Sequence, residues 1–258
     1  MNSVYFGSDP YRSFEHNLMG RSYDPNVYNS GVRSSGVRIK TVWVFLLAAP
    51  WLMAQEETPD KRLQRTADTL HQISAARDGG IPLRLLARAQ CIVVVPDMKK
   101  AAFLVGGHYG RGFASCRVPG SWSAPAPVRL TGGSFGLQLG ADSTDIVLLV
   151  MNERGLERLL SDKFALGVDV NVAAGPVGRD ANADTDALLH AEVVAWSRSR
   201  GAFAGVALNG TVVEHDRAEA IRLYGRPWSN REIIRGGLAM PDPARVLTTE
   251  LSREIYKK

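Results

Sequence analysis

The stretch from residue 131 to residue 150 constrains the fold most, because its pattern allows little other than β-structure. Within it Phe135, Leu137 and Leu139 alternate with glycine and glutamine, which places the three side chains on one face of a strand. After a further glycine, Ile146 begins an unbroken apolar run that ends at Val150, as in a strand buried on both faces. The stretch therefore predicts a pair of adjoining β-strands.

Around this pair, the chain divides into a helical beginning, a β-rich middle and a helical end. Thr58 as N-cap and Pro59 at the first helical position predict a first helix that ends at the glycines 79 and 80, and a short helix is expected over 82–89. Further strands are predicted near 91–95, 101–107, 110–117, 134–139, 145–151, 168–174, 192–198, 201–207 and 211–214.

Capping signals place the remaining helices. Asn152 caps a helix that interrupts the strands, and three closing helices are indicated by Asp216-x-x-Glu219, Ser229-x-x-Glu232 and the pair Asp242-Pro243. This order predicts one α+β domain over residues 55–258. In it a largely antiparallel β-sheet or partly closed barrel is packed by N- and C-terminal helices.

The segment ahead of this domain is typical of export. Residues 1–36 are rich in Asn, Ser, Gly and Tyr and lack periodicity, so we expect a disordered or untranslated leader. Residues 37–54 combine the basic Arg38 and Lys40, a short apolar segment and a small residue, Ala54, at a cleavage point, which predicts a signal peptide. The segment is shorter than the about 20 residues that a membrane span needs, and a buried core helix is the alternative. We expect an exported protein of the periplasm or cell envelope.

The two cysteines have two interpretations. In an oxidising compartment Cys91 and Cys116 could form a disulfide. Alternatively, Cys91 opens a buried-looking apolar run, where a free cysteine serves as a small hydrophobic residue.

The charge balance is mildly basic. The chain has 31 Lys and Arg against 26 Asp and Glu, a net charge of +5. Such an excess permits an anionic partner, and the absence of long runs of like charge argues against nucleic-acid binding.

Motifs for catalysis or metal binding are incomplete. Gly132-x-Ser134-x-Gly136 has the form of a hydrolase nucleophile elbow, with Asp142, Asp145 or Asp169 followed by His190 or His215 as triad partners. That motif needs a helix after the serine, whereas the residues that follow alternate like a strand. We therefore expect no enzyme, and a serine hydrolase using Ser134 is the alternative.

The acidic run from Asp180 to Asp186 departs from a calcium loop, with Thr185 where glycine is required and Ala191 at the twelfth position. We expect no metal ligands and no cofactor, although a loose cation site in this run stays open.

Several segments, in this order, resemble the SYLF domain. They are 106–112, 122–125, 130–140, 143–152, 172–178 and 196–205. The resemblance runs from about residue 60 to residue 253. It implies phospholipid binding without catalysis; eukaryotic relatives bind phosphoinositides and associate with actin, often with an appended domain. Because no such domain is expected here, the chain resembles the exported bacterial single-domain form, for which actin is an unlikely partner.

Basic side chains are the natural contacts for headgroup phosphates, since Arg and Lys donate charge-assisted hydrogen bonds. The candidate lipid-binding residues are Lys99, Lys100, Arg111, Arg117, Lys163, Arg179, Arg198 and Arg200. Four such contacts, at about 1 kcal/mol each, would give only millimolar attraction. An apolar contribution is therefore needed from Trp122, Phe113 or the helix near Pro59, unless these aromatic residues pack in the core. A structural envelope protein without a lipid ligand is a further alternative.

Overall fold

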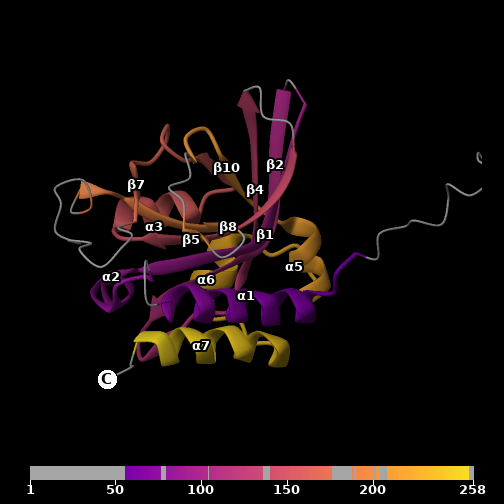
Figure 1. Cartoon of the computed structure of the whole chain (residues 1–258). Coiled ribbons are helices and arrows are strands. Elements are labelled where there is room, and N and C mark those ends of the chain that lie inside the picture. The colour runs from indigo at the N-terminus through magenta and orange to yellow at the C-terminus, as the bar shows by residue number, and fades with distance from the viewer. Residues whose placement is uncertain are drawn as a thin grey trace, which may run out of the picture. The chain divides into compact units, whose positions relative to one another are not determined.

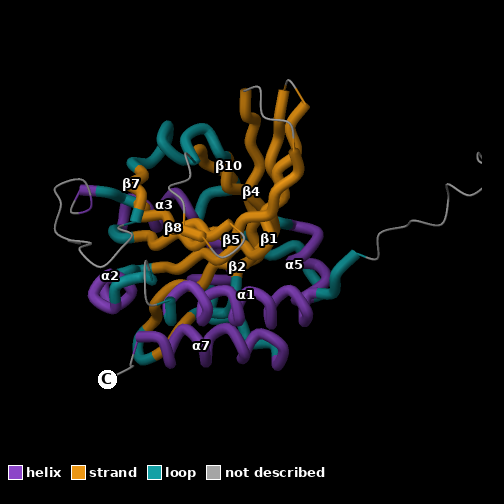
Figure 2. Tube along the Cα trace, in the orientation of Figure 1, coloured by secondary structure: helices purple, strands orange, loops and turns teal. Residues whose placement is uncertain are grey.

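The computed structural model describes residues 56–76, 80–103, 105–135, 140–175, 188, 190–199, 202–203 and 208–255, all within the unit Gln55–Lys258. Its strands form a curled sheet (Figures 1 and 2). They are β1 (Cys91–Phe103), β2 (Val105–Val118), β3 (Ser121–Trp122), β4 (Ala126–Phe135), β5 (Gly140–Val150), β6 (Lys163–Ala165), β7 (Val172–Ala174), β8 (Val193–Ser199), β9 (Ala202–Phe203) and β10 (Val212–His215).

The strand order is β6-β10-β4-β2-β1-β5-β8-β7, with β3 paired to β2 and β9 to β8. Each of these pairs is antiparallel except β7 with β8, so the predicted, largely antiparallel α+β fold is confirmed. The four longest strands, β4, β2, β1 and β5, lie side by side at its centre. Their ends project beyond the helices in Figure 1.

Several strand predictions were wrong in their bounds, and two of the departures have a clear cause. Residues 136–139 of the predicted strand 134–139, and all but Ala202 and Phe203 of the predicted strand 201–207, lie outside the described residues. The predicted strand 101–107 is divided between β1 and β2, because Phe103 pairs with Val105 in the hairpin register. β1 instead runs without interruption from Cys91 to Phe103. Its pairing register with β5 shifts between Val95 and Met98, where Asp97 has a positive φ of 50°. The predicted strand 168–174 is reduced to β7, because the chain turns at Gly167 with a φ of 75°.

The helices follow their capping signals. They are α1 (Pro59–Ser74), α2 (Leu83–Arg88), α3 (Glu153–Leu159), α5 (Arg217–Tyr224), α6 (Asn230–Arg235), the short 3₁₀ turn η2 (Asp242–Ala244) and α7 (Arg245–Ile255). Thr58, Asn152 and Ser229 cap α1, α3 and α6 through their side chains, and Ser229 with Glu232 forms the full reciprocal box.

The core has two layers, one on each face of the sheet. In β1 the side chains of Cys91, Val93 and Val95 enter one layer and those of Ile92 and Val94 enter the other. The helices α1 and α7 lie side by side over the second layer (Figure 1), and α3 and α6 cover the first. Residues 146–150 of β5 are therefore buried on both faces, as their apolar run predicts.

A disulfide joins Cys91 and Cys116, which are direct partners in the β1–β2 register. This decides between the two interpretations of the cysteines in favour of pairing. Of the helices in the described ranges, none is both long and apolar enough to cross a membrane.

Candidate functional site

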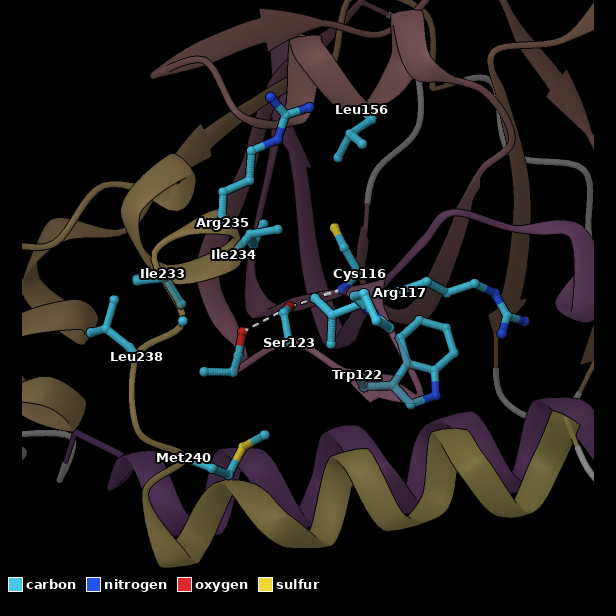
Figure 3. A pocket seen from close by; sticks show the side chains of 14 residues that line it. Cys116, Arg117, Trp122, Ser123, Leu156, Ile233, Ile234, Arg235, Leu238 and Met240 are labelled. Atoms are coloured by element: carbon cyan, nitrogen blue, oxygen red, sulfur yellow. Dashed lines mark hydrogen bonds between the residues drawn. The ribbon is translucent and has the colours of Figure 1, made fainter.

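A pocket of about 540 Å³, lined mainly by apolar side chains, opens beside this disulfide (Figure 3). The β2–β3 hairpin forms one wall, Leu156 of α3 lies above it, and α6 with the segment that follows it forms the opposite wall. The residues that line it are Cys116, Arg117, Val118, Pro119, Trp122, Ser123, Ala124, Leu156, Ile233, Ile234, Arg235, Gly237, Leu238 and Met240. Its volume lies within the range of about 300–1,000 Å³ that is usual for small-molecule sites.

The local sequence explains both walls. The tight turn at Gly120, with a φ of 74°, reverses the chain so that Trp122 pairs with Arg117 across the hairpin. On the other side α6 ends at Gly236, and Gly237 adopts a φ of 61°, which turns the chain away from the helix axis. Leu238 and Met240 therefore face the pocket rather than continue α6 (Figure 3).

The polar side chains of the lining already have hydrogen-bond partners within the protein. Ser123 Oγ accepts from the backbone N–H of Cys116 at 3.0 Å and donates to the carbonyl of Ala124 at 3.1 Å. Arg117 lies over the Trp122 ring and donates to the carbonyls of Leu86, Ala87 and Ala89. The pocket therefore offers a ligand mainly apolar side chains, which suits hydrocarbon better than a polar molecule.

The charged side chains of the lining are both basic. It contains two arginines, Arg117 and Arg235, and no carboxylate. Arg235 pairs with Glu153 and Glu157 at 2.8 and 2.7 Å, but these ion pairs are about half exposed and so contribute little stability. An arginine held this weakly remains available to an anionic group at the edge of the pocket.

The predicted basic residues that the structure describes do not form one site. Lys99, Lys100 and Arg198 lie near one another on β1 and β8, separated by β5. Acidic residues alternate with them: Lys100 is opposite Asp142, Lys99 lies 4.0 Å from Asp97, and Arg198 pairs with Asp145 at 2.7 Å. The local charge is therefore nearly balanced, which weakens the case for electrostatic docking at these three residues.

Arg111 has a structural role. Its guanidinium binds Asp216 and Glu219 of the α5 N-terminus and Glu56 ahead of α1. Glu219 also pairs with Arg62 of α1, so its side chain does not complete the predicted capping box. This buried network leaves Arg111 without support as a lipid contact.

The remaining candidates are dispersed. Lys163 lines a second cavity of about 400 Å³ together with Arg129, Glu214 and His215, apart from the first pocket. Among the candidates in the described ranges, Arg117 alone lines the pocket beside the disulfide. Arg179, Arg200 and the acidic run from Asp180 to Asp186 lie outside the described residues.

The two aromatic residues proposed for the apolar contribution to lipid binding have different surroundings. Phe113 is fully buried in the core layer under α1 and α7, so the core-packing alternative holds for it. Trp122 is also largely buried but lines the pocket. The sequence analysis did not identify the residues that complete the pocket from α6 onward. The glycine pair 236–237, which marks the end of α6, was the signal in the sequence that could have indicated a turn there.

The described residues give no support to the hydrolase alternative with His215 as the partner of Ser134. Ser134 lies within β4 opposite Gly106, and residues 136–139, where the motif requires a helix, lie outside the described residues. In the β4–β10 register His215 is opposite Val128, six residues from Ser134, which is about 20 Å along a strand. Its Nδ1 atom is hydrogen-bonded to Asn230 instead.

A family model described as "Las17-binding protein actin regulator" (Ysc84) matches residues 131–254. Protein YSC84 of Saccharomyces cerevisiae is 33% identical over 184 residues, which are 69% of this chain and 39% of that protein. SH3 domain-containing YSC84-like protein 1 of Xenopus laevis is 32% identical over 170 residues, covering 65% of this chain and 50% of that protein.

This chain belongs to the SYLF (Ysc84) family. A further relative, LAS seventeen-binding protein 3 of Saccharomyces cerevisiae, is 33% identical over 169 residues, covering 64% of this chain and 36% of its own length. This chain thus spans half or less of the length of each of these relatives. The family description concerns binding and regulation, and it stands against the expectation that actin is an unlikely partner.

Proposed function

We propose that this SYLF domain binds an anionic phospholipid without catalysing a reaction, and that the pocket beside the disulfide takes one hydrocarbon chain of the lipid. The observation that carries the proposal is the pocket lining. It combines apolar side chains, internally satisfied polar groups and two arginines without a carboxylate.

The expected energies favour the pocket over surface charge. Each buried methylene contributes about 0.8 kcal/mol, so about eight methylenes would contribute roughly 6 kcal/mol before the costs of association. Basic contacts such as Lys99 and Lys100 add about 1 kcal/mol each near an anionic surface, and the acidic neighbours reduce that value here. The hydrocarbon chain of the lipid would therefore set the affinity. The basic residues would set the preference for anionic over neutral headgroups.

The test is flotation of the purified chain with vesicles of phosphatidylcholine alone or mixed with phosphatidylglycerol. Leu238→Asp places a carboxylate in the pocket and should abolish most of the binding. Ile221→Asp is the matched control, because Ile221 is half exposed on α5 and does not line the pocket. Equal binding by Leu238→Asp and the parent protein, with both folded, would contradict the proposed site.

We place this function outside the cytoplasm. The signal layout of residues 37–54 supports export, and the Cys91–Cys116 disulfide is typical of an oxidising compartment. The mature chain should begin near Gln55. Intact mass spectrometry of protein from the producing cell tests this, and a mass that retains residues 41–53 would contradict it.

Actin binding is the second candidate function, because the family description names an actin regulator. Co-sedimentation with filamentous actin, with and without lipid, distinguishes the two. Pelleting with actin that Leu238→Asp leaves unchanged, together with no vesicle binding, would favour the second candidate.

A further inference from the structure

We propose that His71, Glu250 and Glu254 bind a divalent transition-metal ion of the zinc type and thereby join the first and last helices of the domain. His71 lies in the last turn of α1, and the two glutamates are one turn apart on α7. The two helices run side by side (Figure 1), which brings together residues 183 positions apart in the sequence. The incomplete metal motifs of the sequence gave no signal for this cluster.

The ligand atoms are already close to the spacing that a metal requires. His71 Nδ1 lies 3.0 Å from Glu250 Oε1 and 2.9 Å from Glu254 Oε1, and all three atoms lie within 4.8 Å of one another. Zinc bonds to nitrogen and carboxylate oxygen are about 2.0–2.2 Å long, so atoms that share one ion lie about 3–4 Å apart. Small side-chain movements would therefore suffice.

More groups converge on His71 Nδ1 than one ring nitrogen can serve. Two carboxylate oxygens and the Nη2 atom of Arg253, at 2.8 Å, all lie within hydrogen-bond distance of it. A protonated Nδ1 can donate to one carboxylate but cannot accept from Arg253, and an unprotonated Nδ1 can satisfy neither carboxylate. A cation between the three ligand atoms would interact favourably with each of them.

Burial adds a second reason. Glu250 is 8% exposed and Glu254 is 1% exposed, and they have the same charge one turn apart on α7. Like charges at this spacing repel each other, and buried carboxylates are costly unless a cation compensates them. Two carboxylates and one imidazole suit zinc and its neighbours, whereas magnesium and calcium prefer oxygen ligands alone.

Arg253 occupies the position of the cation. Its Nη2 atom lies 2.7 Å from Glu250 Oε1 as well as 2.8 Å from His71 Nδ1. The Arg253 side chain is about half exposed, so it can turn outward and release the ligand atoms. Arg253 is therefore a competitor of the metal, and its removal should strengthen metal binding.

The experiment titrates the full chain, treated with a chelator and dialysed, with zinc chloride by isothermal calorimetry, with magnesium chloride as the comparison. We expect one zinc ion per chain and no heat from magnesium. Arg253→Ala should bind zinc at least about tenfold more tightly than the parent. His71→Ala and Glu254→Gln should each bind at least about tenfold more weakly.

His190→Ala is the matched control. It removes an exposed histidine that is not part of the proposed site, so the zinc affinity should be unchanged. The proposal fails if neither the parent nor Arg253→Ala binds one zinc ion per chain. It also fails if Arg253→Ala binds zinc no more tightly than the parent. In either case the cluster is an ion-pair network. Unchanged binding in His71→Ala would place the metal elsewhere and also overturn it. Should Glu254→Gln fail to fold, the Arg253→Ala result decides, because it changes a half-exposed side chain.

Discussion

Replacing Asp216 by asparagine tests the buried ion network that connects α1, β2 and α5. Asp216 is 2% exposed. Its Oδ2 atom accepts a hydrogen bond from Arg111 Nε at 2.5 Å, and its Oδ1 atom accepts one from the backbone N–H of Glu219 at 3.1 Å, which caps α5. Asparagine retains the cap, since it is a good N-cap residue, but loses the charge.

The expected loss in the free energy of unfolding depends on the ion pairs that Arg111 retains in the variant. Breaking a buried pair by removing one partner costs about 3–5 kcal/mol when the other charge is left alone. Arg111 still contacts Glu219 and Glu56 in the variant. We therefore predict a loss near the lower end, about 3 kcal/mol in the free energy of unfolding, and about 1 kcal/mol more for Asp216→Ala, which also removes the cap.

The pH dependence gives an independent check. Burial by itself raises the pKa of Asp216, but the hydrogen bonds from Arg111 and from the Glu219 backbone, with the charges of Arg111 and Arg129, outweigh it and lower the pKa below 3.8. Because the pKa of the folded state is the lower one, the stabilisation is complete above 3.8 and is lost as the pH falls through the folded-state value.

Urea unfolding at a series of pH values measures both effects, with the midpoint and the slope reported separately. The difference between parent and Asp216→Asn should be constant between about pH 5 and pH 7 and should shrink below about pH 4. A difference under about 0.5 kcal/mol at pH 7, or one that persists unchanged in acid, would refute the reasoning.

Three further predictions concern the disulfide, the sheet and the surface charge. Reducing the Cys91–Cys116 bond, which closes a loop over 25 positions, should lower stability by about 3 kcal/mol in urea unfolding, and no change on reduction would mean that the bond is absent in solution. Gly112→Ala should destabilise the fold by more than about 2 kcal/mol, because its Cβ would lie 2.0 Å from the Val94 carbonyl oxygen, whereas Gly133→Ala, with nothing nearer than 4.0 Å, should be close to neutral; equal thermal shifts would contradict this packing. Reversing Lys99 and Lys100 together to glutamate should halve vesicle binding or more at low salt and have little effect at high salt, and a loss independent of salt would show that charge is not its cause.

The sequence predicted the elements whose signals are local. Thr58, Asn152 and Ser229 cap their helices with their own side chains, so three residues of sequence contain the information. The central strand at Ile146 is likewise apolar throughout because both of its faces are covered. The family resemblance had partly the same basis, since three of its six segments, 106–112, 130–140 and 143–152, have most of their residues in the central strands β2, β4 and β5.

Other features depended on partners far away in the sequence. Residues 126–130, the first half of β4, were not predicted as part of a strand. In the structure Pro127 is opposite Phe113 in the β2–β4 register, and its carbonyl accepts a hydrogen bond from the backbone N–H of Asp216, a partner far away in the sequence. Arg111 was predicted as a lipid contact from its charge alone. Its buried partners, Asp216 and Glu219, come from α5, more than a hundred residues later in the chain.

The pocket was beyond sequence reasoning for the same reason. Its two walls come from Trp122 and from Leu238, which are more than a hundred residues apart and show no common pattern.

Basic residues, in contrast, were easy to identify in the sequence, but their ion pairing was not. Whether an arginine is paired with a carboxylate, as Arg198 is with Asp145, depends on the strand register.

The most direct test of the central claim uses Trp122 as a reporter inside the pocket. Phosphatidylglycerol with bromine atoms along one acyl chain quenches tryptophan fluorescence only at close contact, and Trp122 is one of the five tryptophans of the chain. The account predicts saturable quenching in the parent protein that is lost in Trp122→Phe and in Leu238→Asp but is retained in Ile221→Asp. Quenching that Trp122→Phe leaves intact, or its absence from a folded parent protein at saturating lipid, would contradict a hydrocarbon chain in this pocket.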